Sequence, residues 1–358
     1  MSFGLMKGGQ YPVAIDFGVG ALKVLQLASG EPPAVVIAGA LPTPEQFLND
    51  PQGRLAFQYE ALPAFLKELG VKTRRAVCSV SSSQTFVQHL HLPRNITTPA
   101  RTQVSDQLQS LFQCDISQLV LRHFDVGEMT YRGARCLEVI AVAMPAAVIQ
   151  SHMRALRGCR LEVVGIHTEH LAAVRAFDYL LGEEDADNSA MTNLYVDIGY
   201  GSTKIVIAHG GQPAVARTLK IGGQHLDAPV AAARQSSLTD TRARRIAGDA
   251  DPEGDDTVAR ARAALVDRLT EDIRTCIRYH DAIAPGRCVE RVIFFGGEAA
   301  SRELTIGIAE ALHLPAHLAD AFGRLERDHD ASTSEVDLTS PQPGWVTPVG
   351  LSLSPTNL

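Results

Sequence analysis

The sequence lacks the features that mark several large classes of protein. Its six cysteines are scattered with no C-x-x-C pair, and residues 1–10 contain no apolar segment of a secretory leader. The longest uncharged apolar run, 139–149, is far shorter than the ~20 residues of a membrane-spanning helix. We therefore expect a cytoplasmic protein with reduced, mostly buried thiols, which needs a partner for any association with a membrane.

The sequence also lacks a strong charge of one sign. Lys and Arg number 33 against 40 Asp and Glu, 45% of the residues are hydrophobic and 20% are charged. This ordinary globular composition excludes a polybasic nucleic-acid-binding protein and a disordered chain. The 358 residues are enough for two domains with cores of their own.

One pattern occurs twice in the chain. Residues 13–27 align without gaps on residues 194–208, and both segments read as an apolar run, D-x-G-x-G-x-x-K and a second apolar run. Each copy predicts a β-hairpin with a tight glycine turn. The acidic segment 182–192 between them is a plausible crossing between two halves. The duplication therefore predicts two related α/β domains that face each other.

The remaining periodicity predicts a mixture of helices and strands. We expect a β-α-β-β-α-β-like insertion in the first half, and a long helix followed by a strand and a Gly-Gly turn in the second. The expected helices are 57–69, 98–112, 146–157, 168–181, 257–283 and 303–312, and the expected strands are 76–80, 85–92, 135–144, 161–167 and 291–295. Residues 249–256 and 328–343 are expected to be surface loops before a last apolar segment, 345–353.

The paired hairpins are the main candidate for chemistry. Glycine turns expose backbone N–H groups, and two facing turns could hold a polyphosphate from both sides. Asp16 and Asp197 would then lie near the phosphates, where a Mg²⁺ ion held partly through water makes their charge tolerable. Lys23 and Lys204 could supply counter-charge. The alternative is that each Asp-x-Gly only closes a hairpin.

Other residues carry weaker signals. Residues 292–300 predict a buried strand and a Gly-Gly turn that would let the backbone approach a base or ribose. Glu169 stands where a strand gives way to a helix, so it either orients a water for hydrolysis or is a solvated first-turn residue. His167 and His170 have metal-like spacing without a third ligand. Arg242, Arg244 and Arg245 form either a solvated helix face or a nucleotide contact.

In this order and at these separations, the segments resemble the phosphate 1, phosphate 2 and adenosine motifs of a protein superfamily. This superfamily unites actin, the heat-shock chaperone ATPases and the sugar kinases. Within it the sequence resembles the PilM family, the actin-like and FtsA-like cytoplasmic component of type IV pilus assembly. The supporting stretches are 14–18 with Lys23, 75–93, 196–199, 217–223, 294–298 and 348–351.

The resemblance implies a set of nucleotide-binding residues for ATP and Mg²⁺. It places the phosphate 1 motif at Asp16, Gly18, Gly20 and Lys23, and the phosphate 2 motif at Asp197, Gly199, Gly201, Ser202, Thr203 and Lys204. Gly222 and Gly223 would line the nucleotide cleft, and the adenosine side would consist of Gly296, Gly297 and Glu298. Asp16 and Asp197 would hold Mg²⁺ partly through water, and Glu169 is the candidate catalytic residue.

The resemblance also implies an architecture and a partner. The expected fold class is α/β, with duplicated actin-like (ribonuclease H-like) domains and an FtsA-like subdomain insertion. The N-terminal domain would span 1–185 with a displaced small subdomain at about 71–160, and the C-terminal domain would span 192–358 with a nucleotide-side subdomain at about 224–288. A groove in the N-terminal half would bind the cytoplasmic tail of a PilN-like inner-membrane protein, and pilus motor ATPases are further candidate partners.

The sequence departs from the family pattern at two places. Residues 19–22 offer no hydroxyl between Gly18 and Lys23, and the Arg-rich segment 241–245 stands where a helix usually supplies Glu and Lys to the nucleoside. Loss of one or two charge-assisted hydrogen bonds, worth roughly 1.5–3 kcal/mol each, could weaken binding tenfold or more. We therefore expect a nucleotide-responsive scaffold that is at most a slow ATPase.

Alternative functions stay open within the same fold. A small-molecule kinase needs a carboxylate base in the cleft, and no glycine-rich substrate loop with its own Asp is evident. A docking protein that has lost its nucleotide is the other alternative. An FtsA-like or MreB-like filament protein, a heat-shock chaperone and the secretion protein GspL fit less well, because the expected membrane helix, further domain or membrane span is not found.

Overall fold

The computed structural model describes residues 9–94, 97–112, 115–181, 191–247 and 256–356. The chain divides into two compact units, each with a large β-sheet of its own. Unit 1 comprises residues 1–81, 150–180 and 320–358, and unit 2 comprises residues 82–149 and 181–319. Residues 320–356 therefore belong to the same unit as residues 9–81.

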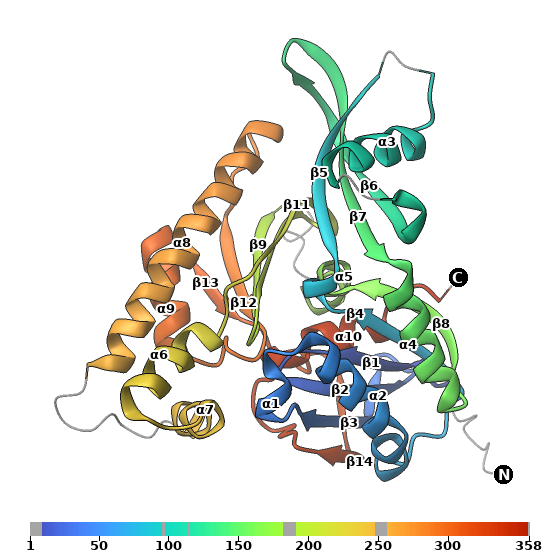
Figure 1. Cartoon of the computed structure of the whole chain (residues 1–358), viewed down its shortest axis with the longest axis vertical. Coiled ribbons are helices and arrows are strands. Elements are labelled where there is room, and N and C mark those ends of the chain that lie inside the picture. The colour runs from blue at the N-terminus through green and yellow to red at the C-terminus, as the bar shows by residue number, and fades with distance from the viewer. Residues whose placement is uncertain (1–8, 95–96, 113–114, 182–190, 248–255, 357–358) are drawn as a thin grey trace. The chain divides into compact units, whose positions relative to one another are not determined.

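Unit 1 is built on a six-stranded sheet of order β14-β3-β2-β1-β4-β8 (Figure 1). The neighbours β1, β2 and β3 run antiparallel, whereas β4 lies parallel to β1 and β8 lies parallel to β4. The strands are β1 (Val13–Phe17), β2 (Ala21–Ala28), β3 (Ala34–Pro42), β4 (Arg75–Val80), β8 (Glu162–Thr168) and β14 (Glu326–Ser334).

Helices supply the rest of unit 1. Apolar side chains of α2 (Pro51–Glu68) and α4 (Ala146–Gly158) pack with β1 to β4 and β8 in one buried core. The short helix α10 (Val346–Ser352) is buried along its whole length and contacts β1, β2 and β4. Its Gly350 packs so closely on α5 (Glu169–Leu181) that a Cβ there would lie 1.8 Å from the Ala172 carbonyl oxygen. The remaining helical turns are α1 (Glu45–Leu48) and η3 (Pro343–Trp345).

Unit 2 repeats the central part of this arrangement. Its five-stranded sheet has the order β11-β10-β9-β12-β13, with the same strand directions as β3-β2-β1-β4-β8 of unit 1. The strands are β9 (Thr192–Ile198), β10 (Thr203–His209), β11 (Gln212–Leu219), β12 (Arg291–Phe295) and β13 (Ala316–Leu318). The equal strand order confirms the duplication that the repeated motif predicts.

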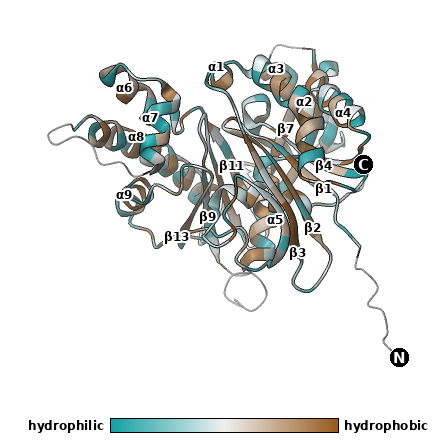
Figure 2. Cartoon of the chain, turned by 90° about the horizontal axis from the view of Figure 1, so that it is seen from below, coloured by the Kyte–Doolittle hydropathy of each residue, from teal (hydrophilic) through white to brown (hydrophobic). Residues whose placement is uncertain are grey.

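The core of unit 2 lies between this sheet and its helices. The 27-residue helix α8 (Thr257–Ile283) buries Leu265, Leu269 and Ile273, the apolar stripe expected from the sequence. The other helices described between residues 191 and 319 are α6 (Gln224–Arg234), α7 (Leu238–Ala247) and α9 (Arg302–Leu312). Figure 2 shows the strands of the sheets largely in the hydrophobic colour, whereas the Arg-rich α7 is mostly hydrophilic.

A three-stranded sheet of order β5-β7-β6 is inserted between β4 and β8 along the chain. It consists of β5 (Phe86–Pro93), β6 (Leu119–Tyr131) and β7 (Ala134–Pro145), and α3 (Ala100–Phe112) packs on it through Val104 and Leu108. Two short 3₁₀ turns flank these elements, η1 (Ser82–Gln84) and η2 (Ile116–Gln118). The structure thus inserts β5, α3, β6 and β7 between two strands of the unit 1 sheet, whereas the separate subdomain at about 71–160 stays a prediction.

The inserted sheet is joined to the rest of unit 2 by polar and apolar contacts. The buried Glu138 of β7 accepts a hydrogen bond from Tyr279 of α8 at 2.6 Å and pairs with His89 at 2.7 Å. The N–H of Ala216 in β11 donates to His89 Nε2 at 3.2 Å, and Ala216 also packs against Ile140. The insertion and the five-stranded sheet therefore belong to one compact unit.

One expectation from the sequence is wrong. The sequence predicts a surface loop at 328–343, but residues up to Ser334 belong to β14, which pairs parallel with β3 at the sheet edge. The strand is polar and shows no alternation of apolar side chains, because edge strands need not bury a face. The other expected acidic loop, 249–256, lies outside the described residues except at 256, and the expected crossing 182–192 does so up to 190. Among the described helices, none is long and apolar enough to cross a membrane.

Candidate functional site

The phosphate 2 hairpin of unit 2 is held together by a buried ion pair. In the register of β9 and β10, Asp197 lies opposite Lys204, and Lys204 Nζ lies 2.8 Å from Asp197 Oδ2. The turn closes through a hydrogen bond from Gly199 N–H to the Ser202 carbonyl at 3.0 Å. Next to it, Thr203 Oγ1 donates to the Ile221 carbonyl at 2.8 Å. Thr203 and Lys204 thus contribute to the rigidity of the turn.

Three of the sequence-predicted segments meet at this turn because glycine allows their backbones to approach. A Cβ on Gly222 would lie 2.3 Å from the Gly199 carbonyl oxygen, and a Cβ on Gly223 would lie 2.4 Å from Glu298 Cδ. Gly296 has a φ of +94°, and a Cβ there would lie 2.2 Å from Asp197 Oδ1. Unit 2 therefore brings the phosphate 2 turn, residues 222–223 and the adenosine turn 296–298 into direct contact.

The same turn keeps backbone donors available. Within the described residues, the N–H groups of Tyr200 and Gly201 donate to no protein acceptor. A Cβ added to Gly297 would meet no atom within 4 Å, so open space lies beside the adenosine turn. Adjacent N–H groups in a glycine turn are typical of anion-binding loops. The residues present at this end of β9 fit a phosphate group.

The arginines of α7 turn toward buried carboxylates instead of forming a solvated face. Arg245 binds the fully buried Asp227 of α6 through two hydrogen bonds, at 2.7 and 3.1 Å, and its Nη2 lies 2.8 Å from Glu298 Oε2. Arg242 Nη2 lies 3.2 Å from Glu298 Oε1. Of the three arginines, only Arg244 is exposed. The solvated-face interpretation is therefore wrong for Arg242 and Arg245.

Arg242 and Tyr200 link this network to the phosphate 2 turn. The Arg242 guanidinium lies over the Tyr200 ring, 4.6 Å from its centroid, which is a cation–π geometry. Burial raises the pKa of Tyr200 to about 12, so its phenol is neutral at pH 7. The carboxylate of Glu298 thus joins the adenosine turn to α7, at the segment where the sequence departs from the family pattern.

The phosphate 1 hairpin of unit 1 has the same register with different side-chain partners. Asp16 lies opposite Lys23, as Asp197 lies opposite Lys204. Asp16 Oδ1 accepts a hydrogen bond from Ser79 Oγ of β4 at 2.6 Å. At the turn itself, the carbonyl of Gly18 accepts a hydrogen bond from Gln58 Nε2 of α2 at 2.8 Å.

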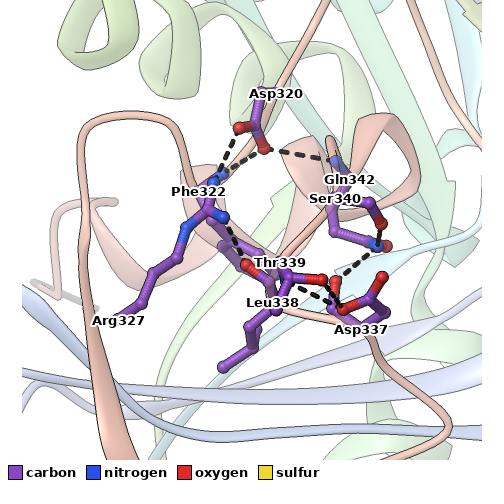
Figure 3. Close-up of polar contacts among 8 residues, drawn as sticks. All are labelled: Asp320, Phe322, Arg327, Asp337, Leu338, Thr339, Ser340 and Gln342. Carbon is purple, nitrogen blue, oxygen red and sulfur yellow. Dashed lines mark hydrogen bonds and ion pairs between the residues drawn. The ribbon is translucent and has the colours of Figure 1, made fainter.

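Lys23 contacts residues from the end of the chain. Its Nζ donates to the Gly344 carbonyl and lies 5.7 Å from the centroid of the Trp345 ring. The segment before Gly344 is held in place by hydrogen bonds in a polar cluster around Asp320 (Figure 3). There Arg327 Nη2 donates to Asp320 Oδ2 at 2.8 Å, and the N–H of Gln342 donates to Asp320 Oδ1 at 3.2 Å. The phosphate 1 lysine is therefore positioned by a structured C-terminal segment.

Glu169 begins α5 directly after β8, the strand-to-helix junction expected from the sequence. It is only 6% exposed, so the alternative of a solvated first-turn residue is wrong. Its neighbour His167 lies 3.1 Å from Arg175, and burial together with Arg175 lowers the pKa of His167 to about 4. Among the described residues, no group of three or more His, Cys, Asp and Glu side chains could hold a metal ion.

Sequence reasoning missed several residues of these clusters. Arg54 and Gln58 on α2, Ser79 on β4, and Tyr200 and Asp227 in unit 2 received no role, yet all are buried. For Arg54 and Gln58 a signal exists, because the apolar stripe at 62, 65 and 66 continues backwards through 58 and 54 at helical spacing. Polar residues in a buried stripe are candidates for binding. Nothing in the sequence pattern marks Ser79 or Asp227.

Comparisons with known proteins agree with this architecture. A family model described as "Type IV pilus assembly protein PilM" matches residues 14–355. The fold is similar to a chain of the solved "PilM-PilN type IV pilus biogenesis complex", with a TM-score of 0.79 and 19% identity over 97% of this chain and 99% of that one.

A second solved structure has a more distant likeness. It is the ethanolamine utilization protein EutJ from Carboxydothermus hydrogenoformans, with a TM-score of 0.53 and 14% identity. The match covers 98% of this chain and 91% of that one. Together these findings confirm the expected actin-like α/β fold with its inserted subdomain.

Proposed function

The chain belongs to the PilM family of type IV pilus assembly proteins, and we propose that it is a nucleotide-responsive scaffold. It binds ATP with Mg²⁺, and nucleotide binding changes its affinity for a short cytoplasmic peptide of a PilN-like inner-membrane protein. The observation that carries the proposal is the convergence of the phosphate 2 turn, residues 222–223 and the adenosine turn in unit 2.

The glycine contacts support a ligand that needs close approach of the backbone. The turn at 199–201 offers N–H groups to phosphate oxygens, and Gly297 leaves space beside the adenosine turn. Asp16 and Asp197 would hold Mg²⁺ partly through water, which would offset the charge of the phosphates. In this role Lys204 keeps Asp197 oriented, since the two side chains form an ion pair at 2.8 Å.

Slow hydrolysis is compatible with these residues. Glu169 is the candidate for orienting a water molecule, and its burial at the start of α5 fixes its position. No hydroxyl occurs between Gly18 and Lys23, so the phosphate 1 turn contributes only backbone donors and the lysine. We infer that binding, not turnover, is the main use of the nucleotide.

The solved relative supports the partner part of the proposal, since its description names a PilM-PilN complex. A PilN-like protein would recruit this chain peripherally to the inner membrane from the cytoplasm, and pilus motor ATPases would be further partners. We propose 82–149 as the inserted subdomain, within the expected limits of about 71–160, because β4 is a central strand of unit 1. The remaining domain boundaries, 1–185, 192–358 and 224–288, stay predictions.

Calorimetric titration tests the nucleotide part directly. We expect ATP with Mg²⁺ to bind the purified protein with micromolar affinity and slow phosphate release, and glucose or glycerol to have no effect. Asp16→Asn and Asp197→Asn should each abolish binding, whereas Asp178→Asn and Asp240→Asn, which change exposed carboxylates in units 1 and 2, should not. Normal binding by both site variants would refute the proposal, and turnover stimulated by sugars would indicate a kinase.

Fluorescence anisotropy tests the partner part. A labelled peptide from the cytoplasmic tail of the PilN-like protein of the same organism is titrated with and without ATP and Mg²⁺. We expect binding whose affinity changes with nucleotide in the wild type but not in Asp16→Asn. Equal affinity under both conditions would contradict nucleotide response while leaving a docking function.

A further inference from the structure

A buried and incompletely bonded arginine lies near the phosphate 1 turn. Arg54 on α2 is only 2% exposed, and its Nε and Nη2 atoms have no hydrogen-bond partner among the described residues. Buried charges are normally paired and fully hydrogen-bonded, since an unsatisfied one is costly. A guanidinium in this condition indicates a missing anionic ligand.

The neighbours of Arg54 locate that ligand. Gln58 lies one helical turn further along the same face of α2 and donates to the carbonyl of Gly18 at 2.8 Å. The face that carries Arg54 is therefore the face that packs against the phosphate 1 turn. The start of the helix is fixed by Asp50, whose side chain accepts a hydrogen bond from the Gln52 N–H at 3.1 Å.

A second observation places Arg54 beside the candidate catalytic residue. Burial lowers the pKa of Arg54, and the negative charges of Glu169 and Asp50 oppose this shift. Glu169 thus acts electrostatically on the guanidinium, although Arg54 forms no ion pair with any described carboxylate. Arg54 therefore lies on the helix face that packs against the phosphate 1 turn, within electrostatic range of the residue proposed to orient the hydrolytic water.

We propose that Arg54 binds the terminal phosphate of ATP and makes the protein distinguish ATP from ADP. This inference rests on the proposed nucleotide function. The terminal phosphate is the group that a water oriented by Glu169 would attack, and the phosphate 1 turn would hold it on the side of Arg54. Guanidinium matches phosphate with two parallel charge-assisted hydrogen bonds. These bonds compensate for the hydroxyl that residues 19–22 do not supply.

The test compares ATP and ADP affinities of Arg54 variants by calorimetry, each with Mg²⁺. Arg54→Met removes the charge and keeps most of the apolar stem, and Arg54→Lys keeps the charge without the planar fork. Lys67→Met makes the same change at an exposed position of the same helix and is the matched control. Thermal melting without nucleotide is measured for every variant.

We expect Arg54→Met to weaken ATP binding about tenfold or more, with a much smaller effect on ADP. Arg54→Lys should be intermediate, and Lys67→Met should match the wild type. Because an unsatisfied buried charge is removed, Arg54→Met should melt no lower than the wild type without nucleotide. A purely structural arginine would instead lower the melting temperature and weaken ATP and ADP equally.

The outcomes separate the two proposals. If the wild type binds ATP but Arg54→Met and Arg54→Lys keep its ATP-to-ADP ratio, the role of Arg54 is wrong and the nucleotide function stands. If Arg54→Met fails to fold, the ratio measured for Arg54→Lys decides, since the conservative variant keeps the charge. If the wild type binds neither nucleotide, both proposals are wrong.

Discussion

The two hairpins that share D-x-G-x-G-x-x-K have the same strand register, but their aspartate and lysine side chains contact different residues. Asp16 lies opposite Lys23 in one and Asp197 lies opposite Lys204 in the other. In unit 2 the opposed residues form a buried ion pair at 2.8 Å. In unit 1 the aspartate accepts from Ser79, and the lysine donates to the carbonyl of Gly344.

The neighbouring strand explains the difference. Ser79 follows Cys78, whose register partner on β1 is Ile15, so its hydroxyl lies beside Asp16 and donates to it. The equivalent residue of unit 2 is Phe295, the register partner of Asp197 on β12. The Phe295 side chain has no hydrogen-bond donor, and in this hairpin Asp197 forms an ion pair with Lys204. The repeated motif therefore determines the geometry of the turn, and residues on the neighbouring strand influence which partner the aspartate has.

Replacement of the two aspartates should give the largest difference between the hairpins in the free energy of unfolding. Asp197→Ala removes the carboxylate that pairs with the buried Lys204 at 2.8 Å, and loss of one member of a buried pair costs about 3–5 kcal/mol. Asp16→Ala removes the acceptor of a neutral hydroxyl, which costs about 1–3 kcal/mol. Denaturant unfolding without nucleotide measures both. Equal losses would contradict the assignment of different partners.

Adjacent glycines of the adenosine turn give the next largest contrast. Gly296→Ala places a methyl group against Asp197 at a φ of +94°, and should cost at least about 2 kcal/mol. Gly297→Ala meets no atom within 4 Å and should change stability by less than about 1 kcal/mol. Thermal melting of the two variants measures this, and a similar loss in both would mean that the turn is not packed on β9.

The two lysines should differ in their effect on tryptophan fluorescence. Trp345 is the single tryptophan of the chain, and Lys23 Nζ lies 5.7 Å from its ring centroid. Lys23→Met removes a cation–π contact worth about 0.5–1 kcal/mol, so the emission of Trp345 should shift in the folded protein. Lys204→Met, in unit 2, should leave the emission of the folded protein unchanged. An unchanged spectrum in Lys23→Met would contradict the contact.

Equivalent strands also allow a smaller test with pH. His167 on β8 has its pKa lowered to about 4, mainly by burial, whereas His317 on the matching strand β13 is exposed. In the unfolded chain His167 takes up a proton near pH 6.5, whereas in the folded protein it does so only near pH 4. The free energy of unfolding should therefore decrease as the pH falls through this range. His167→Asn should flatten that fall, and His317→Asn should not. Chemical denaturation at several pH values measures it.

The sequence predicts the parts of the fold that have a local cause. The hairpins follow from glycine turns between β-rich runs, and the stripe of 257–283 gives α8 with its bounds unchanged. The polar edge strand β14 has no such pattern, because its pairing with β3 is decided by a partner from the opposite end of the chain. Strand β6 escapes sequence analysis for a related reason, since its side chains are only half-buried or exposed.

The candidate site shows the same limit. The glycines and aspartates of the motifs can be predicted from the sequence because a tight turn requires these residue types. The partners Ser79, Asp227 and Arg54 depend on which strands and helices become neighbours, so they become visible only in the folded chain. Arg242 and Arg245 show how a locally reasonable interpretation fails, since a charged helix face looks solvated until buried carboxylates are found beneath it.

The packing of α10 has a consequence for the order in which the protein is made. Strand β1 is synthesised before its contact partner α10 at Val346–Ser352 and before β14 at Glu326–Ser334, which extends its sheet. During synthesis unit 1 therefore lacks two of its elements until residues 326–352 have been added, whereas unit 2 contains no residue beyond Ala319. The unit begun second can thus finish folding first, and an incomplete chain leaves the first sheet uncovered where α10 belongs.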